Sequence, residues 1–276
     1  MLSKGYKAGG VSVGNNTNAG NVPFERPFKK EQLWNYELGF KSELWDNRLR
    51  LNGSIFHIEW ENLQLEAFRF LTRGDLSSNF EQTINVANAD ANGVELEFFA
   101  LPTEQLTLSG GVGWLDTEIT SSETAQLSGG LVVDLHGRDV PKSPEWTLNM
   151  AGEYRWPIGQ NEAWLRLEYI FRSGQYSDIE ALTWDQHRGR PTQGGGLVPA
   201  TINGDPSFPY ATPDYNLLNL RAGFDWDAFR FTVYVENLTD EEYWTGTQEN
   251  FGLSGIRLRP HPRYWGGSVS YSWGGI

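Results

Sequence analysis

The stretch Leu165-Arg166-Leu167-Glu168-Tyr169-Ile170-Phe171-Arg172 decides the fold class, because apolar and charged residues alternate along it. A period of two places alternate side chains on opposite faces of a β-strand. One face then carries Leu165, Leu167, Tyr169 and Phe171, and the other carries the charges. The stretch therefore predicts a strand with one apolar face and one charged face.

The same alternation occurs nine times along the chain, and Leu2–Gly10 forms a weaker tenth segment. The nine segments begin at Trp34, Leu49, Val94, Leu106, Trp146, Leu165, Leu218, Phe229 and Trp265. Near Ile55 and Phe56 the apolar positions change parity, for which we expect a β-bulge. Repeated segments of this kind predict an all-antiparallel sheet whose strands pair in sequence order.

The connections between these segments alternate in length. Tight turns are expected at Leu44–Arg48, Pro102–Gln105, Pro157–Asn161 and Asp225–Ala228. Long loops are expected at Val11–Leu33, Glu66–Ala91, Glu118–Ser143, Ser173–Asp214 and Thr239–Arg263. Such sorting is typical of outer-membrane barrels, whose short turns are periplasmic and whose long loops are extracellular. The sequence thus predicts an all-β, antiparallel transmembrane β-barrel, present in part with about ten strands.

The composition agrees with a barrel and argues against other classes. Hydrophobic residues make up 39% of the 276 residues, and no segment approaches the ~20 consecutive apolar residues of a membrane helix. Barrel strands hide their apolar residues at every second position. The net charge of −13 argues against a nucleic-acid partner. The absence of cysteine excludes disulfides and thiolate metal sites.

Six segments resemble, in their order along the chain, those of TonB-dependent outer-membrane receptors. They are Ser3–Gly10 (SKGYKAGG), Leu33–Lys41 (LWNYELGFK), the run from Arg48 to Gln64, Asn92–Glu97 (NGVELE), Val235–Tyr243 (VENLTDEEY) and Arg263–Gly267 (RYWGG). The resemblance spans nearly the whole chain. It implies a place in a plugged barrel of about 22 strands in the bacterial outer membrane.

The resemblance also implies a function. Receptors of this family import iron–siderophore complexes, cobalamin or other scarce ligands, with energy relayed through TonB. The implied partners are outer-membrane lipid, a small ligand such as an iron–siderophore complex, a plug domain and TonB. We therefore expect a role in siderophore uptake and iron transport, and no enzyme activity, catalytic residue, cofactor or resident metal.

The number of strands bears on completeness. We expect residues 1–276 to be the C-terminal portion of such a barrel, without its plug domain and N-terminal strands. Met1–Gly10 lacks the apolar core of a signal peptide. Gly274, Gly275 and Ile276 follow Trp273, where the family usually ends on an aromatic residue. A gene fragment, a split gene and a false start at Met1 are all open.

Two patterns that suggest catalysis have simpler interpretations. Gly10–Gly14 matches the nucleophile elbow G-x-S-x-G, but that motif needs a helix directly after the serine, and Asn15–Gly20 has loop composition. The histidines are scattered and lack the H-x-x-x-H spacing of a metal site, so we expect them to be solvated or packed. They are His57, His136, His187 and His261.

Charged residues in one phase of the strands form a row that we expect to point into the barrel. The row consists of Glu95, Glu97, Glu153, Arg155, Arg166, Glu168, Arg172, Arg221, Arg230 and Glu236. A wet lumen wall with paired charges is one interpretation, because barrel interiors are polar. A docking surface for the plug domain is the other, and the sequence does not separate them.

The long loops Ser173–Asp214 and Thr239–Arg263 carry the candidate ligand contacts. These residues are Trp184, His187, Arg188 and Arg190 in the first loop, and Tyr243, Trp244, Arg257 and Arg259 in the second. Arginines suit anionic chelates because they donate bidentate hydrogen bonds, and aromatic rings suit flat ligand faces. The alternative for each residue is a solvated loop position that contacts no ligand.

Two other functions stay open at this point. An independent outer-membrane barrel of about ten strands with a hydrolytic loop site, as in omptin-like proteases, fits the strand number but not the six motifs. A soluble carbohydrate-binding β-protein fits the aromatic content of 14%, because tryptophan serves sugar binding as well as membrane girdles.

Overall fold

The computed structural model describes residues 1–16, 22–70, 79–121, 124–126, 132–176, 211–250 and 254–273. One antiparallel sheet contains β1 (Leu2–Lys7), β4 (Glu31–Leu44), β5 (Leu49–Phe70), β6 (Asn79–Ala100), β7 (Leu106–Ile119), β10 (Trp146–Ile158), β11 (Asn161–Arg172), β14 (Tyr215–Trp226), β15 (Phe229–Glu236) and β18 (Tyr264–Tyr271). Four hairpins pair β2 (Gly10–Asn16) with β3 (Val22–Phe28), β8 (Thr124–Gln126) with β9 (Val132–Asp134), β12 (Gln175–Tyr176) with β13 (Ala211–Thr212), and β16 (Gly246–Asn250) with β17 (Ser254–Leu258). Within these ranges no helix is long and apolar enough to cross a membrane.

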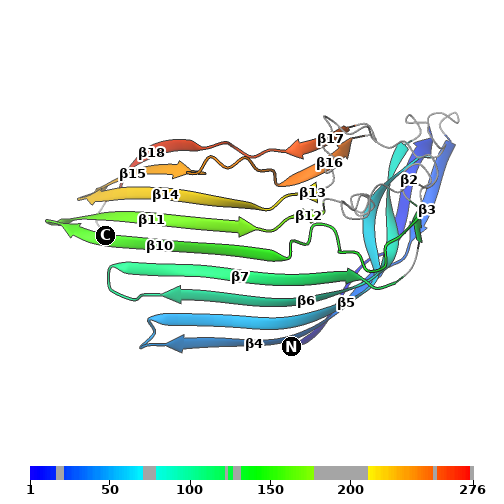
Figure 1. Cartoon of the computed structure of the whole chain (residues 1–276), viewed down its shortest axis with the longest axis horizontal. Helices are drawn as coiled ribbons and strands as arrows, with labels where there is room; N and C mark the ends of the chain where they lie inside the picture. The colour runs from blue at the N-terminus through cyan, green and yellow to red at the C-terminus, as the bar shows by residue number, and fades with distance from the viewer. Residues whose placement is uncertain are drawn as a thin grey trace.

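The ten strands of the large sheet are neighbours in the order in which they occur in the sequence. Figure 1 shows them side by side, with the short turns at the left and the hairpins β2–β3 and β16–β17 at the right. We call these the turn end and the loop end. The edge strands β1 and β18 do not pair with each other within the described residues, so the sheet is open there. The predicted fold class, strand number and pairing order are confirmed.

Alternation gives the sheet two chemically different faces, which we call the apolar face and the polar face. On the apolar face, Leu38 is 72% exposed, Val233 63% and Val269 64%. Val233 lies opposite Ala222 on β14 and Gly267 on β18, so it belongs to a row that crosses three strands. A broad exposed apolar surface of this kind is normally covered by lipid or by a partner.

The prediction of a bulge near Ile55 and Phe56 is wrong. The register of β5 against β6 runs through both residues without interruption. Ile55 lies on the apolar face, opposite Val94. Phe56 lies on the polar face above Gly93, where an added Cβ atom would stand 2.1 Å from the ring. An aromatic ring that covers a cross-strand glycine therefore accounts for the change of parity.

The register of β5 against β6 shifts nearer the loop end instead. The shifts fall between Trp60 and Leu63, and again between Leu63 and Gln64. Asn62, inside the first shift, has a φ of 56°, and its N–H donates to Asn88 Oδ1 at 3.0 Å. A bulge bends its strand and increases the twist. The two strands therefore change direction here and continue beyond the rest of the sheet.

The predicted long loops contain more strand than we expected. β5 and β6 occupy most of Glu66–Ala91. The hairpin β2–β3 begins at Gly10 and otherwise falls within Val11–Leu33, and the hairpin β16–β17 lies inside Thr239–Arg263. These segments lack a clean apolar row, so the period-two signal that identifies a half-buried strand is weak in them. The four predicted tight turns are confirmed.

A buried apolar cluster covers the polar face at the loop end of β5, β6 and β7. It consists of Leu63, Ile84, Ala87, Ala89, Ile119, Leu135 and Val140, with Trp60, Leu65 and Tyr176 packed against it. Leu135 and Val140 come from the predicted loop Glu118–Ser143. This segment is held to β7 because Ile119 N donates to Arg138 O at 2.7 Å and Val140 N donates to Thr117 Oγ1 at 3.1 Å.

Candidate functional site

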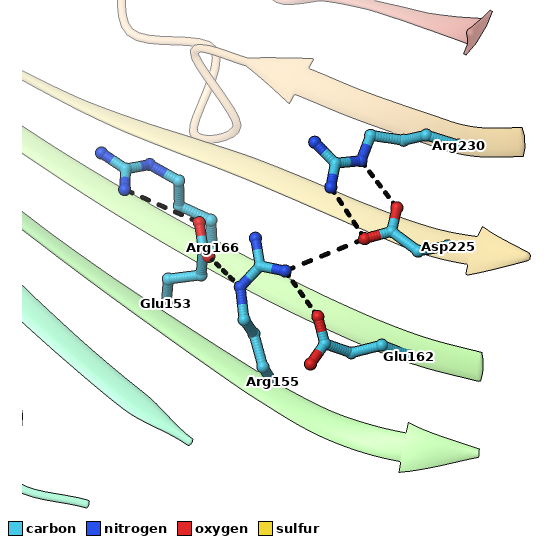
Figure 2. Close-up of polar contacts among 6 residues, drawn as sticks. All are labelled: Glu153, Arg155, Glu162, Arg166, Asp225 and Arg230. Carbon is cyan, nitrogen blue, oxygen red and sulfur yellow. Dashed lines mark hydrogen bonds and ion pairs between the residues drawn. The ribbon is translucent and has the colours of Figure 1, made fainter. Parts of the chain in front are cut away.

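The polar face of β10, β11, β14 and β15 carries a connected network of ion pairs (Figure 2). Arg155 is its centre, with Nε 2.7 Å from Glu153 and Nη1 2.6 Å from Glu162 and 3.8 Å from Asp225. Asp225 also accepts two hydrogen bonds from Arg230, at 2.6 and 2.8 Å. All four strands contribute, so the network links them across the face near the turn end.

A second group of pairs lies farther from the turns. Arg166 pairs with Glu168 at 2.7 Å and also approaches Glu153 at 3.8 Å, which joins it to the first group. Arg221 on β14 pairs with Glu236 on β15 at 3.0 Å. The ion pairs therefore continue along the strands from the turn end toward the loop end.

Two arginines on this face keep an unused hydrogen-bond donor. Arg172, the last residue of β11, donates from Nη2 to Gln175 Oε1 at 3.2 Å. The Nε atoms of Arg172 and Arg221 are buried and have no acceptor among the residues that the structure describes. A guanidinium offers five N–H donors and no acceptor, so both side chains make fewer hydrogen bonds than they could among the residues that the structure describes.

We call the full set the charge mosaic. It contains five arginines and five carboxylates: Arg155, Arg166, Arg172, Arg221, Arg230, Glu153, Glu162, Glu168, Asp225 and Glu236. Its formal charge is 5 − 5 = 0. The paired side chains are partly exposed, from 18% for Glu153 to 53% for Arg230. Partly exposed pairs contribute only ~0–1 kcal/mol each to stability, so the mosaic is not explained by stability alone.

Eight mosaic residues belong to the row that the sequence predicted, and the structure places that row on one face. Glu162 and Asp225 were missed, because each lies beside a predicted tight turn. Their strand parity, shared with Arg166 and Arg221, was the signal that would have found them.

The other two residues of the predicted row, Glu95 and Glu97, lie apart from the mosaic on β6. Their cross-strand neighbours on β7 are Gly113 and Gly111, which have no side chain. Neither carboxylate has a hydrogen bond or an ion pair within the described part of the chain. The polar face therefore carries the connected network on β10–β15, one separate pair between Arg50 and Glu43 at 3.3 Å, and two carboxylates on β6 without a partner in the described part of the chain.

The predicted ligand contacts in Thr239–Arg263 come together at the base of the β16–β17 hairpin. The Tyr243 ring packs against that of Tyr215, with centroids 4.8 Å apart and the planes tilted by 37°. Burial, Tyr215 and Glu236 raise the pKa of Tyr243 above the usual range of tyrosine. Arg259 pairs with Glu242 at 2.8 Å.

The other candidate contacts are placed less completely. Trp244 is half-buried beside this hairpin base, and Arg257 lies opposite Thr247 in the hairpin, with its side chain outside the described residues. Trp184, His187, Arg188 and Arg190 all fall within 177–210, which is also outside the described residues.

The NLTD motif is a hydrogen-bonded turn after β15. Asn237 is 3% exposed, has a φ of 53°, and exchanges two side-chain hydrogen bonds with the backbone of Glu241, at 2.8 and 2.9 Å. Asp240 accepts from Arg263 N at 3.2 Å, and its carboxylate lies 3.5 Å from the Arg263 guanidinium. The motif therefore fixes the entry to β18, which is a structural role.

The patterns that suggested catalysis occupy structural positions. Ser12 lies within strand β2, and its Oγ accepts a hydrogen bond from Thr83 N at 3.1 Å. His57 lies on a strand, with Nδ1 2.9 Å from Asn92 Oδ1 and Nε2 3.8 Å from Glu59. No group of three potential metal ligands occurs among the described residues.

An antiparallel sheet with an exposed apolar face, a charged opposite face and all short turns at one end is the wall of a transmembrane β-barrel. The family described as "TonB dependent receptor-like, beta-barrel" matches residues 2–238, and the chain belongs to this family. The resemblance seen in the sequence motifs is confirmed.

Relatives with known names are receptors and transporters. The metal-pseudopaline receptor CntO of Pseudomonas aeruginosa is 31% identical over 106 residues, which cover 38% of this chain and 14% of CntO. The ferric yersiniabactin uptake receptor FyuA of Yersinia pestis superposes with a TM-score of 0.65 at 21% identity, covering 97% of this chain and 33% of FyuA. The ferripyoverdine receptor of Pseudomonas aeruginosa superposes with a TM-score of 0.61 at 16% identity, covering 98% of this chain and 30% of that receptor.

At identities of 21% and 16%, the two solved structures establish only that the fold is shared. The chain spans about one third of the length of each receptor.

Proposed function

We propose that this chain forms part of the wall of a TonB-dependent receptor that imports a ferric siderophore or a related scarce metal chelate across the bacterial outer membrane. The two-faced sheet carries the proposal. Its apolar face suits the acyl chains of a bilayer, and its polar face suits a hydrated lumen. The named relatives take up metal complexes, which supports a ligand of the same class.

The chain serves, in this proposal, as the C-terminal portion of the receptor barrel. Its sheet has two open edges, and an open edge in lipid leaves backbone groups without partners at several kcal/mol each. The remaining strands and the plug domain must then come from elsewhere. Residues 1–276 expressed alone, with an export signal, should fail to restore uptake to a strain that lacks the receptor. Restored uptake would contradict this part of the proposal.

Glu95 and Glu97 are the proposed contacts for the plug domain. Both carboxylates lie on the polar face without a cation beside them in the described structure, and both face glycines that leave room for an approaching side chain. Arginine or lysine on a plug would supply charge-assisted hydrogen bonds. Glu95→Gln with Glu97→Gln should loosen the plug, measured as faster proteolysis of it, whereas Glu43→Gln on the same face should not.

The loop residues Trp184, His187, Arg188, Arg190, Tyr243, Trp244, Arg257 and Arg259 are the proposed ligand contacts. Tyr243 and Tyr215 provide a pair of packed aromatic rings at the loop end, and the charge of Arg259 is held by Glu242, the residue that precedes Tyr243. Together they combine a flat ring with a cation, which suits an anionic chelate.

The decisive experiment uses the organism that carries this gene. Iron-starved cells with an in-frame deletion should take up less radioactive iron from the spent medium of the parent strain, and a protonophore should abolish the difference. The protein should cofractionate with the outer membrane. Equal uptake by deleted and parent cells, or recovery of the protein from the soluble fraction, would reject the proposal.

A further inference from the structure

The two halves of the polar face differ in access from the loop end. On β5, β6 and β7 the apolar cluster covers this face, and Ala89, Ile119 and Leu135 are all 0% exposed. The segment that contains Leu135 and Val140 is hydrogen-bonded to Ile119 and Thr117, so it is an integral part of the wall. A charged solute that entered here would lose its hydration to an apolar surface that offers no compensating partner.

The half formed by β10, β11, β14 and β15 has no such cover among the described residues. Its mosaic side chains remain partly exposed from Arg230 at the turn end to Arg221 farther up. Along β11 the mosaic extends from Glu162 to Arg172, ten residue steps that correspond to about 33 Å of extended strand. Barrel strands tilt by about 35–45°, so this length corresponds to about 25 Å along the membrane normal, which matches the ~25 Å height of the apolar band of outer-membrane barrels.

The chemistry of the mosaic suits a polar solute that carries anionic groups. Four of the five guanidinium groups are held by a carboxylate and that of Arg172 by the amide oxygen of Gln175. An anionic group of the solute can take the place of a carboxylate at little electrostatic cost. Because the mosaic is neutral overall, it offers many weak contacts and no deep trap for either sign of charge.

We infer that the solute crosses the barrel along the wall of β10, β11, β14 and β15, passing from one arginine of the mosaic to the next, and not along β5–β7. The solute class is a chelate with carboxylate, phenolate or similar anionic groups. The inference rests on the proposed function, and it adds the side of the barrel on which the route lies.

The test uses single cysteines, since the natural chain has none. Thr232 and Asn52 are each the fourth residue of a strand that leaves a tight turn, and both lie on the polar face, on β15 and β5 respectively. Thr232→Cys therefore probes the mosaic wall and Asn52→Cys probes the covered wall at matched depth. A membrane-impermeant, anionic methanethiosulfonate reagent is added outside iron-starved, energised cells.

We expect Thr232→Cys to react about tenfold faster than Asn52→Cys, a barrier difference of about 1.4 kcal/mol. A protonophore should slow the reaction at Thr232 more than at Asn52. Ala151→Cys on β10 and Ser54→Cys on β5 provide a second pair if either variant is absent from the outer membrane. Equal rates, faster reaction on β5, or no reaction at either wall would overturn the inference. The deletion assay judges the proposed function separately, because it does not depend on which wall reacts.

Discussion

Arg166 on β11 and Arg221 on β14 lie directly opposite each other in the register of the sheet. Like charges in directly opposed positions destabilise a strand pair. Each arginine is held instead by its own carboxylate, Glu168 at 2.7 Å and Glu236 at 3.0 Å. The two repelling cations are therefore tolerated because each is paired with its own anion.

Removing one of these carboxylates should leave the repulsion between Arg166 and Arg221 uncompensated. In the receptor that contains this chain, Glu236→Gln should lower the free energy of unfolding by about 1 kcal/mol. Adding Arg221→Gln should recover most of the loss, because the opposed pair is then gone. Denaturant titration of the two single variants and the double variant in phospholipid vesicles measures the coupling. Strict additivity would show that the opposed arginines do not interact.

Neighbouring residues on β15 test the assignment of faces. Val233 lies on the apolar face and Thr232 on the polar face, so Val233→Arg should cost roughly 2–4 kcal/mol more than Thr232→Arg near the bilayer midplane. Leu220→Arg should also be costly, with penalties that shrink toward the strand ends. Unfolding in bilayers of known thickness provides the measurement. A larger penalty at Thr232 than at Val233 would mean that the apolar row does not face lipid.

A cross-strand glycine under a tryptophan should be intolerant of a methyl group. A Cβ atom on Gly223 would stand 2.2 Å from the Trp164 ring, whereas one on Gly111 would meet nothing nearer than the side-chain amide of Asn149 at 3.4 Å and the carbonyl oxygen of Leu96 at 3.5 Å. Gly223→Ala should therefore destabilise the receptor by about 1–3 kcal/mol and Gly111→Ala by much less. Thermal unfolding in detergent compares the two. Similar midpoints for both variants would refute the close packing of Trp164.

The turn after β15 should depend on Asn237 in two separable ways. Asn237→Ala loses both hydrogen bonds to Glu241 and places a Cβ-bearing apolar residue at a φ of 53°. We expect a loss of about 2–4 kcal/mol. Asn237→Gly loses the hydrogen bonds but tolerates the positive φ, so its loss should be smaller. Hydrogen exchange of β18 reports the effect, and a glycine variant worse than alanine would contradict it.

Asp139 should make the covered wall sensitive to pH. Burial first, and then Asp116 and Glu145, raise the pKa of Asp139 above its usual value of 3.8. The charged carboxylate is therefore disfavoured in the folded state, so stability falls as the pH rises from 3.8 through the folded pKa. Asp139→Asn should raise the free energy of unfolding at neutral pH, and the gain should vanish toward 3.8. A gain that persists unchanged in acid would have another origin.

The sequence was sufficient for the strands that have a clean period of two, and it failed where one face is not plainly apolar. The inward phase of Glu153 and Arg155 follows from parity, and the turn ends and the pairing order follow from the succession of period-two segments joined by short connections. The parity change at Phe56 was misread because its ring lies over Gly93, and a cross-strand contact of this kind depends on register. Register also determines which charges pair. The sequence therefore could not predict that Glu95 and Glu97 lie apart from the mosaic. The loop segment with Leu135 and Val140 gave no periodic signal, because its burial depends on the wall beneath it.

The double register shift in β5 and β6 has a mechanical consequence. On the turn side of it, Ile55 and Val94 lie on the apolar face, whereas beyond it Leu65 and Ile84 belong to the cluster on the opposite side. If the hairpin slid inward along the membrane normal, the hydrogen-bonded Gln64 would approach the acyl chains, and if it slid outward, Ile55 and Val94 would be lifted toward water. Both displacements raise the free energy. The double register shift therefore favours one depth of the barrel in its membrane.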